Sequence, residues 1–419
     1  MRVRAVLAAT VALGSAVTGL VLVAAPAYAV DKVCQQVDAT VPAGETSRPS
    51  APYALLDLPA AQDQVLRFGP VLDVPVRVAV VSSGVESGDG MIPVHGTSFG
   101  GGGPIVDPQG TEVAGLVAGV ERGDDLPVGV APGAGIVDVR VFVDRSSDEA
   151  VERPSPGSLA AGLTWLSQVG EQLNVKVAVV PFVVPSSPGL RQAVKAVQSA
   201  GIVVVAAAGD RPDDGSAFAT QLDDQPAHRE DAGNLFFPAG YPDVVTVNAT
   251  GAGDSSPLLE HVVKNSRTKI AAPAYNAVSY GLNGHSCLVQ PTSTGAASGV
   301  VAGVVALLWQ RFPKERAPQI IARLLNTADG TTDDPTPLTG YGVVQPYEAL
   351  TRPLAPSKTG EVERTVVRTE TDTQATAPEP ADDLLASTKE HAVWWGLLGG
   401  GLLVVVLMLR PVLARRRRA

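Results

Sequence analysis

The sequence predicts an α/β protein with a mostly parallel sheet and helices on both of its faces. Short valine-rich segments alternate along the chain with longer segments of helical periodicity. The strand-like segments are apolar at every position, which is typical of parallel strands covered on both sides. Functional loops in such sheets follow the carboxyl ends of the strands, so we expect site residues directly after the valine-rich runs.

Strands and helices are expected in alternation from residue 76 onward. A β-branched run followed by Ser-Ser-Gly indicates the first strand, and valine, alanine and leucine at helical spacing indicate the helix after it. The expected strands are Val76–Val81, Ile136–Phe142, Val175–Val184, Gly201–Asp210 and Val244–Val247, and the expected helices are Thr111–Val120, Leu159–Leu173, Leu190–Ala200 and Ala296–Phe312.

Residues 1–29 have the pattern of a secretory signal peptide. Two arginines precede an apolar run from Ala5 to Ala25, and Ala27-Tyr28-Ala29 forms a small-residue cleavage site. We therefore expect cleavage after Ala29, the alternative being a retained first membrane helix. Residues 30–71 form an N-terminal extension, and residues 72–351 are long enough for one large core.

A second apolar run lies near the other end of the chain. Ala392–Leu409 carries no charge and contains Trp394 and Trp395, and it is long enough to span a hydrocarbon core of about 30 Å. Arg410 and Arg415–Arg418 follow it, which indicates a cytoplasmic end. We expect a transmembrane helix at 391–410 and an Arg-rich cytoplasmic tail at 411–419. The alternative is a buried core helix.

Residues 352–390 are rich in proline, threonine and acidic residues and have no apolar periodicity, so they are expected to be a linker. Together with the two terminal segments, this organisation predicts a single-pass protein of the cell membrane. The large domain would then lie on the extracytoplasmic side.

Charge and cysteine content narrow the possible partners. A net charge of −10 and a pI of about 5.1 argue against a nucleic-acid partner. Cys34 and Cys287 are the only cysteines. Outside the cytoplasm an even number favours a disulfide, and two free buried thiols are the alternative. No cluster has metal-ligand spacing, so neither a metal nor a cofactor is expected.

Several segments, taken in order, resemble those of a known family. "VAVVSSGV" (78–85) resembles an aspartate segment, "QGTEVAG" (109–115) a histidine segment and "VVVAAAGD" (203–210) an oxyanion strand. Further similar segments are "VGVAPGAGIVDVRVF" (128–142), "FPAGYPDVVTV" (237–247) and "TGYGVVQPYEALT" (339–351). The chain resembles the subtilisin-like serine proteases and, within them, the mycosins, which are membrane-anchored proteases of type VII secretion systems.

The resemblance implies four catalytic positions, and each holds an unsuitable residue. A subtilase needs an aspartate, a histidine, a serine nucleophile and an oxyanion asparagine. The positions that match them here are Ser82, Gln109, Gly295 and Asp210. A glutamine amide does not accept a proton near neutral pH, and an aspartate would repel the oxyanion. The site would then hold no group able to shuttle a proton.

Other side chains could take over these roles. "PTS" (291–293) imitates the family's G-T-S in a shifted register, which would make Ser293 the nucleophile. His95 in "HGTS" precedes a Gly-rich run rather than a helix, so it is expected to be a loop residue, as is Ser98 nearby. His228 lies in an acidic stretch that could bind a cation but has no EF-hand spacing. His285 beside Cys287 is expected to be structural.

The segment that binds substrate in the family also departs from its pattern. The family's N-x-S-x-G appears as Ala178, Val180 and Phe182, while Pro181 and Pro185 remove backbone donors. The sequence therefore predicts an inactive mycosin-like pseudoprotease that serves a type VII secretion membrane complex as a binding or structural component. The alternatives are an active subtilisin-like endopeptidase and a hydrolase with a non-standard Ser/His pair using Ser293 or Ser98.

Overall fold

The computed structural model describes residues 32–37, 39–40, 46–120, 128–213, 216–226, 229–251, 257–330, 334–362 and 385–415. The chain separates into two compact units, which divide between Glu363 and Arg364. The predicted signal peptide at 1–29, His228 and the end of the Arg-rich tail lie outside the described residues.

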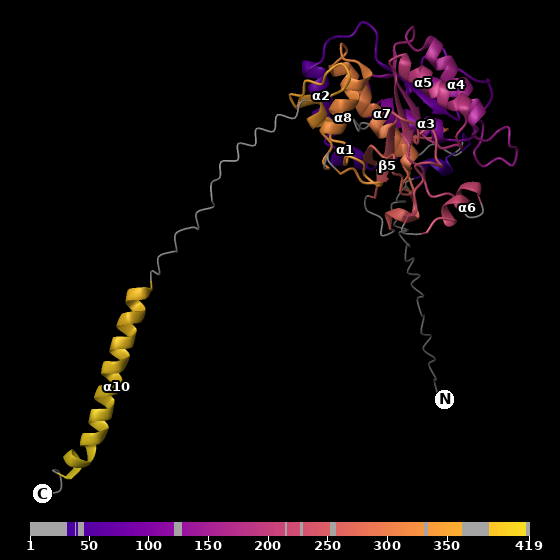
Figure 1. Ribbon diagram of the computed structural model, residues 1–419. Coiled ribbons are helices and arrows are strands. Elements are labelled where there is room, and N and C mark those ends of the chain that lie inside the picture. Colours follow the sequence, from indigo (N-terminus) through magenta and orange to yellow (C-terminus); the bar gives the residue numbers. More distant parts are fainter. Residues whose placement is uncertain are drawn as a thin grey trace, which may run out of the picture. The chain divides into compact units, whose positions relative to one another are not determined.

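The first unit is built on a six-stranded parallel sheet (Figure 1). The strand order is β2-β1-β3-β4-β5-β6, so β1 and β3 lie at neighbouring inner positions and β2 lies at an edge. The strands are β1 (Arg77–Ser82), β2 (Gly135–Arg140), β3 (Val175–Val180), β4 (Val203–Ala207), β5 (Val245–Thr250) and β6 (Ile270–Pro273). The predicted fold class is confirmed.

Helices cover both faces of this sheet because its side chains alternate between two apolar layers. Val78 and Val80 of β1 belong to one layer, with α3 (Gln109–Ala118) and α7 (Thr294–Arg311). Ala79 and Val81 belong to the other layer, with α4 (Pro156–Val169) and α5 (Pro188–Ser199), which lie side by side (Figure 1). Helix α7 is buried along nearly its whole length, which explains its apolar residues on every side.

The N-terminal extension predicted at 30–71 is part of the same body. Helices α1 (Ala51–Leu55) and α2 (Leu58–Phe68) pack against the domain, and Leu58 is buried in its main core. The predicted disulfide is present: Cys34 is bonded to Cys287 in β8 (Ser286–Val289), which pairs antiparallel with β7 (Ala277–Tyr280). The alternative of two free thiols is thereby excluded.

The linker predicted at 352–390 begins later than expected. The first residues of this segment are bonded to the domain: Arg323 Nη2 donates to Leu354 O at 2.9 Å, and Gln319 Nε2 donates to Pro356 O at 2.9 Å. Both donors lie on α8 (Ala317–Asn326). Among the described residues, the remaining elements of the first unit are η1 (Cys34–Gln36), η2 (Gly88–Gly90), α6 (Ala217–Asp223), η4 (Leu258–Glu260) and α9 (Pro346–Thr351).

The second unit contains one long helix, α10 (Ala386–Arg415). Its segment Ser387–Arg410 is long and apolar enough to cross a membrane. This segment includes the span predicted at 391–410.

Candidate functional site

The candidate site forms where three strands end and two helices begin. Ser82 is the last residue of β1, Pro181 directly follows β3, and Asp210 lies three residues after β4. Helix α3 begins at Gln109 and α7 at Thr294. Parallel strands place these ends at one edge of the sheet, as the sequence predicts.

A chain of hydrogen bonds joins Ser82, Gln109 and Pro181. Ser82 Oγ donates to Gln109 Oε1 at 3.2 Å, and Gln109 Nε2 donates to Pro181 O at 3.0 Å. Ser82 is fully buried and Gln109 is 6% exposed. Each partner is therefore satisfied without water, and the amide links the ends of β1 and β3 as a neutral brace.

Gly295 lies beside this brace. A Cβ placed on Gly295 would lie 3.4 Å from Gln109 Nε2 but only 2.5 Å from Pro181 O. Real Cβ atoms do not approach a backbone oxygen so closely, so a side chain here would displace the end of β3. Gly295, which the sequence aligns with the serine position, thus lies next to Gln109, which the sequence aligns with the histidine position.

Asp210 caps the amino terminus of α7. Its Oδ1 accepts from Thr294 N at 2.5 Å and from Thr294 Oγ1 at 2.7 Å, and its Oδ2 accepts from Ser293 Oγ at 2.9 Å. Ser293 is the N-cap residue, and its Oγ also accepts from Gly295 N at 3.1 Å. Ser293 thus serves as a helix cap that is already engaged on both sides.

The charge of Asp210 depends on two opposing effects. Burial of the carboxyl among protein atoms raises its pKa above the usual value, while hydrogen bonds from Thr294 and Ser293 lower it. The residue as a whole is exposed, so solvent reduces the cost of burying the charge. Three donors and the positive end of α7 favour the anion, and we treat Asp210 as ionised near neutral pH.

Asp107 fixes the start of α3. Its Oδ1 accepts from Gln109 N at 2.9 Å, and its Oδ2 forms an ion pair with Arg145 Nε at 2.9 Å. Gly110 also allows the helix to approach the end of β1, because a Cβ there would lie 2.1 Å from Gly84 O. These contacts hold the Gln109 side chain in one position.

Glu112 is a titratable group that sequence reasoning missed. It lies one helical turn after Gln109 and is buried, and burial raises its pKa to about 7, with Arg145 lowering it and Asp107 and Asp210 raising it further. Glu112 can therefore exchange a proton near neutral pH beside the site, while the absence of a proton-shuttling group at the four catalytic positions themselves stays a prediction. The signal was present as the only charged residue in "QGTEVAG".

The contacts of Glu112 separate it from the serines of the site. Glu112 Oε2 accepts from Gln35 Nε2 at 3.0 Å. No hydrogen bond joins the carboxyl to Ser293, whose partners are Asp210, Gly295 and Ala296. A base must reach the proton that it removes, and Glu112 does not meet this condition for Ser293.

The histidines considered above do not complete a catalytic pair in the described part of the chain. His95 N bonds to Ile136 O near the start of β2, and His95 Nδ1 accepts from Thr97 N. His285 lies in the turn between β7 and β8. Neither ring forms a hydrogen bond with Ser293 or Ser98.

In the segment after β3, the side chain of Phe182 packs against another aromatic ring. Phe182 stacks edge-on against Phe142 with ring centroids 5.1 Å apart, and it is largely buried.

Across the described residues, no group of three or more His, Cys, Asp or Glu side chains could hold a metal ion. The site thus offers a neutral amide, a helix capped by the carboxylate of Asp210, and a second carboxylate, Asp107, that is paired with Arg145.

Comparison with known proteins adds an independent finding. The model of the subtilase family, peptidase S8, matches residues 109–344, which is more than half of the chain. The chain belongs to the subtilase family. It is 31% identical to M-protease of Shouchella clausii, covering 66% of this chain and 64% of M-protease, so it spans less than two thirds of that relative.

Among subtilases, the resemblance to mycosins is also confirmed. Mycosin-1 of Mycobacterium tuberculosis is 28% identical, over 67% of this chain and 70% of mycosin-1. The solved structure of MycP1, described as an essential component of the type VII (ESX-1) secretion system, is 25% identical with a TM-score of 0.57, covering 76% and 93% of the two chains. A chain of the periplasmic assembly from the ESX-5 inner membrane complex shares the fold, at 23% identity and a TM-score of 0.59 over 78% and 90%.

Proposed function

We propose that this subtilase is catalytically inactive and serves as a membrane-anchored binding or structural component of a type VII secretion complex. The observation that carries the proposal is the hydrogen-bonded brace of Ser82, Gln109 and Pro181 beside Gly295. In a subtilase the matching residues are the aspartate, histidine and serine of the triad. Here they form a neutral structural contact instead.

Two physical reasons support the absence of proton transfer. The amide of Gln109 has no lone pair basic enough to accept a proton from a hydroxyl near neutral pH. At Gly295 there is no hydroxyl to attack a carbonyl, and Pro181 O occupies the space into which a Cβ would project. Supplying a nucleophile alone would therefore not rebuild the reaction.

At the position that stabilises an oxyanion in subtilases, the polar groups of this chain already bond to one another. Gly295 N already donates to Ser293 Oγ, and the matching asparagine is replaced by Asp210, which carries its own negative charge. A tetrahedral oxyanion would meet a carboxylate instead of an amide donor. Since electrostatic stabilisation of this charge is usually the largest contribution to catalysis, its reversal opposes the reaction.

The proposed location and partners rest on the ends of the chain and on its relatives. Helix α10 supplies a candidate anchor, and the arginines after it favour a cytoplasmic tail with the domain on the extracytoplasmic side. The MycP1 relative supports membrane proteins of a type VII complex as partners. A retained fold without catalytic groups agrees with a role in assembly.

A fluorophosphonate probe tests inactivity directly, because it labels only activated serines. We expect no labelling of the full chain in detergent under conditions that label an active subtilase. Covalent labelling that is lost in Ser293→Ala or Ser98→Ala would overturn the proposal and favour a hydrolase with a non-standard pair.

The proposed partnership has a separate test. The intact chain should co-purify membrane proteins of a type VII complex from native membranes, identified by mass spectrometry. A version that ends at residue 362 keeps the described domain but lacks the anchor, so it separates membrane placement from direct binding. If neither chain retains any component of such a complex, the partnership is wrong, whatever the labelling result.

A further inference from the structure

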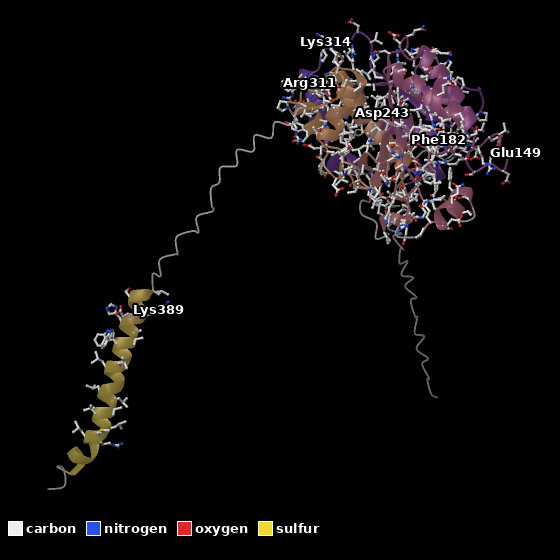
Figure 2. The ribbon with its side chains drawn as sticks, in the orientation of Figure 1. Glu149, Phe182, Asp243, Arg311, Lys314 and Lys389 are labelled. Carbon is white, nitrogen blue, oxygen red and sulfur yellow. A yellow bond between two sulfur atoms is a disulfide. The ribbon has the colours of Figure 1, made fainter. Side chains whose placement is uncertain are left out.

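A pocket lies at the amino ends of β1 and β3, at the opposite edge of the sheet from the candidate site. Its volume is about 240 Å³. Its lining residues are Leu72, Asp73, Val74, Val76, Asn174, Lys176, Trp309 and Pro313. Figure 2 shows Arg311 and Lys314, which flank Pro313 in sequence, well away from Phe182, which follows β3 beside the candidate site.

Trp309 forms part of the pocket wall and has an unsatisfied donor. The residue is 4% exposed, and its Nε1 has no acceptor among the described residues. Buried indole N–H groups normally find a partner, because an unpaired one has lost its hydrogen bond to water without a replacement. Because this nitrogen is itself buried, it is not reached from the pocket, and Trp309 contributes the apolar part of its ring to the wall.

Lys176 adds a positive charge at the same place. Its Nζ lies 5.5 Å from the centroid of the Trp309 ring, and no carboxylate of the described chain pairs with it. The pocket thus presents a donating ammonium beside the ring of an indole. The charge-complementary ligand is a carboxylate.

An exposed apolar stretch borders the pocket. Leu66 is 84% exposed, Phe68 58%, Val71 99% and Val74 46%, all within nine residues of sequence. Scattered apolar residues are normal on a surface, whereas a concentration beside a pocket indicates a contact site.

This stretch is held in place at its far end. Asn174 Nδ2 donates to Pro75 O at 3.0 Å, and Asn174 O accepts from Arg77 N. Gly135 N bonds to Val76 O, which fixes the next residue to the edge strand β2. Asn174 Nδ2 also lies 3.4 Å from Val74 O, so this end of the stretch would lose less conformational entropy on binding.

We propose that the Trp309 pocket and the exposed residues of 66–74 form a docking surface for an extended segment of a partner protein. The segment would place an aspartate or glutamate side chain beside Lys176 and Trp309, and apolar side chains against Phe68, Val71 and Val74. Asp73 also lines the pocket, and its negative charge would repel the carboxylate of this ligand. Removing that charge should therefore strengthen binding. The surface is independent of whether the candidate site is inactive.

Selection from a library of phage-displayed random nonapeptides tests the proposal on the full chain in detergent. Enriched peptides should carry an acidic residue next to apolar ones. Their affinity, measured by fluorescence polarisation, should fall about tenfold or more in Lys176→Gln, because a charge-assisted hydrogen bond is lost. It should fall less in Trp309→Phe, which only reshapes the wall of the pocket. In Asp73→Asn it should rise several-fold.

Matched controls separate binding from folding. Lys195→Gln and Trp165→Phe alter the same residue types on α5 and α4, and they should leave affinity unchanged. Thermal melting of each variant checks the fold, and Lys176 is only half-buried, so its variant keeps the test valid if Trp309→Phe unfolds.

Several results would overturn the proposal. These are an absence of enrichment over empty micelles, enriched peptides without a carboxylate, or unchanged affinity in Lys176→Gln. Competition by acetate alone would reassign the pocket to a small anion. Self-association of the chain that is lost in Phe68→Ser would reassign the surface to a second copy.

Discussion

Gln109 donates from its side-chain amide to the backbone carbonyl of Pro181 at 3.0 Å, and thereby ties the start of α3 to the end of β3. The same carbonyl oxygen lies 2.5 Å from the position that a Cβ on Gly295 would take. One backbone group therefore accounts for both the glutamine and the glycine. Because Gln109 and Gly295 both meet this carbonyl, we expect the effects of mutating the two residues on stability to be coupled.

Restoring the four family residues should not restore proteolysis. In Ser82→Asp/Gln109→His/Asp210→Asn/Gly295→Ser, the new serine Cβ would collide with Pro181 O. We expect no fluorophosphonate labelling and no peptide cleavage, together with a loss of about 1–3 kcal/mol from overpacking, measured by urea denaturation. The triple variant that keeps Gly295 is the control for the collision. Turnover by the quadruple variant would show that the end of β3 adapts readily.

Gln109→Ala should destabilise the domain. It leaves Ser82 and the carbonyl of Pro181 without their amide partner in a buried place, which costs about 1–3 kcal/mol. Gln192→Ala on the exposed side of α5 is the matched control and should have little effect. The free energy of unfolding from denaturant titration decides between them. Equal stability of the two variants would mean that water replaces the brace.

Glu112 should make stability fall as pH rises. Its pKa is raised to about 7 in the fold, above the value near 4.5 expected when unfolded, so the folded state binds more protons between these values. Stability should therefore decrease from pH 4.5 to pH 7 and level off above it, by up to about 3 kcal/mol in total. Because Glu112 is only 4% exposed, solvent screens this effect little.

Glu112→Gln tests this assignment because it keeps the shape and removes the titration. The variant should match the wild type near pH 4.5 and exceed it at pH 8. Asp138 has a pKa raised to about 6 by burial and contributes a slope of the same sign, so only the difference between the variant and the wild type is diagnostic. Parallel pH profiles would rule out Glu112 as the source.

Loss of the disulfide between Cys34 and Cys287 should weaken the domain markedly. The bond joins residues 253 positions apart, and removal of native disulfides typically costs about 2–5 kcal/mol. Cys34→Ser/Cys287→Ser and the reduced wild type should lose similar amounts in denaturant titration. If only the double variant is weakened, the cause is packing of the serines and not the cross-link.

The fold could be predicted because its signals are local. Valine runs such as Val203–Ala207 are apolar throughout, and only a sheet covered on both faces buries such a strand. Helix α2 was not predicted because it buries only Leu58 and Ala61 and exposes the apolar residues Leu66 and Phe68. The folded start of the linker was missed because bonds from Gln319 and Arg323 to backbone carbonyls have no compositional signature.

The site could be predicted in residue identity but not in geometry. The family pattern placed Ser82, Gln109, Asp210 and Gly295 at one edge of the sheet. It could not indicate that Pro181 O accepts the glutamine amide, because any residue could supply that carbonyl. Glu112 was missed for a related reason, since its pKa depends on burial and on charges distant in sequence.

The distance along the chain between the two cysteines also bears on the order of events in the export that we propose. In a polypeptide that crosses a membrane from its amino terminus, the thiol of Cys34 emerges long before that of Cys287. Oxidation must then wait until the described strands have been translocated, because β8, which carries Cys287, is the last of them. The core helix α7 and the helices α8 and α9 still follow. The cross-link can therefore form before the core is complete, and a translocation arrest before residue 287 would leave a free thiol as its marker.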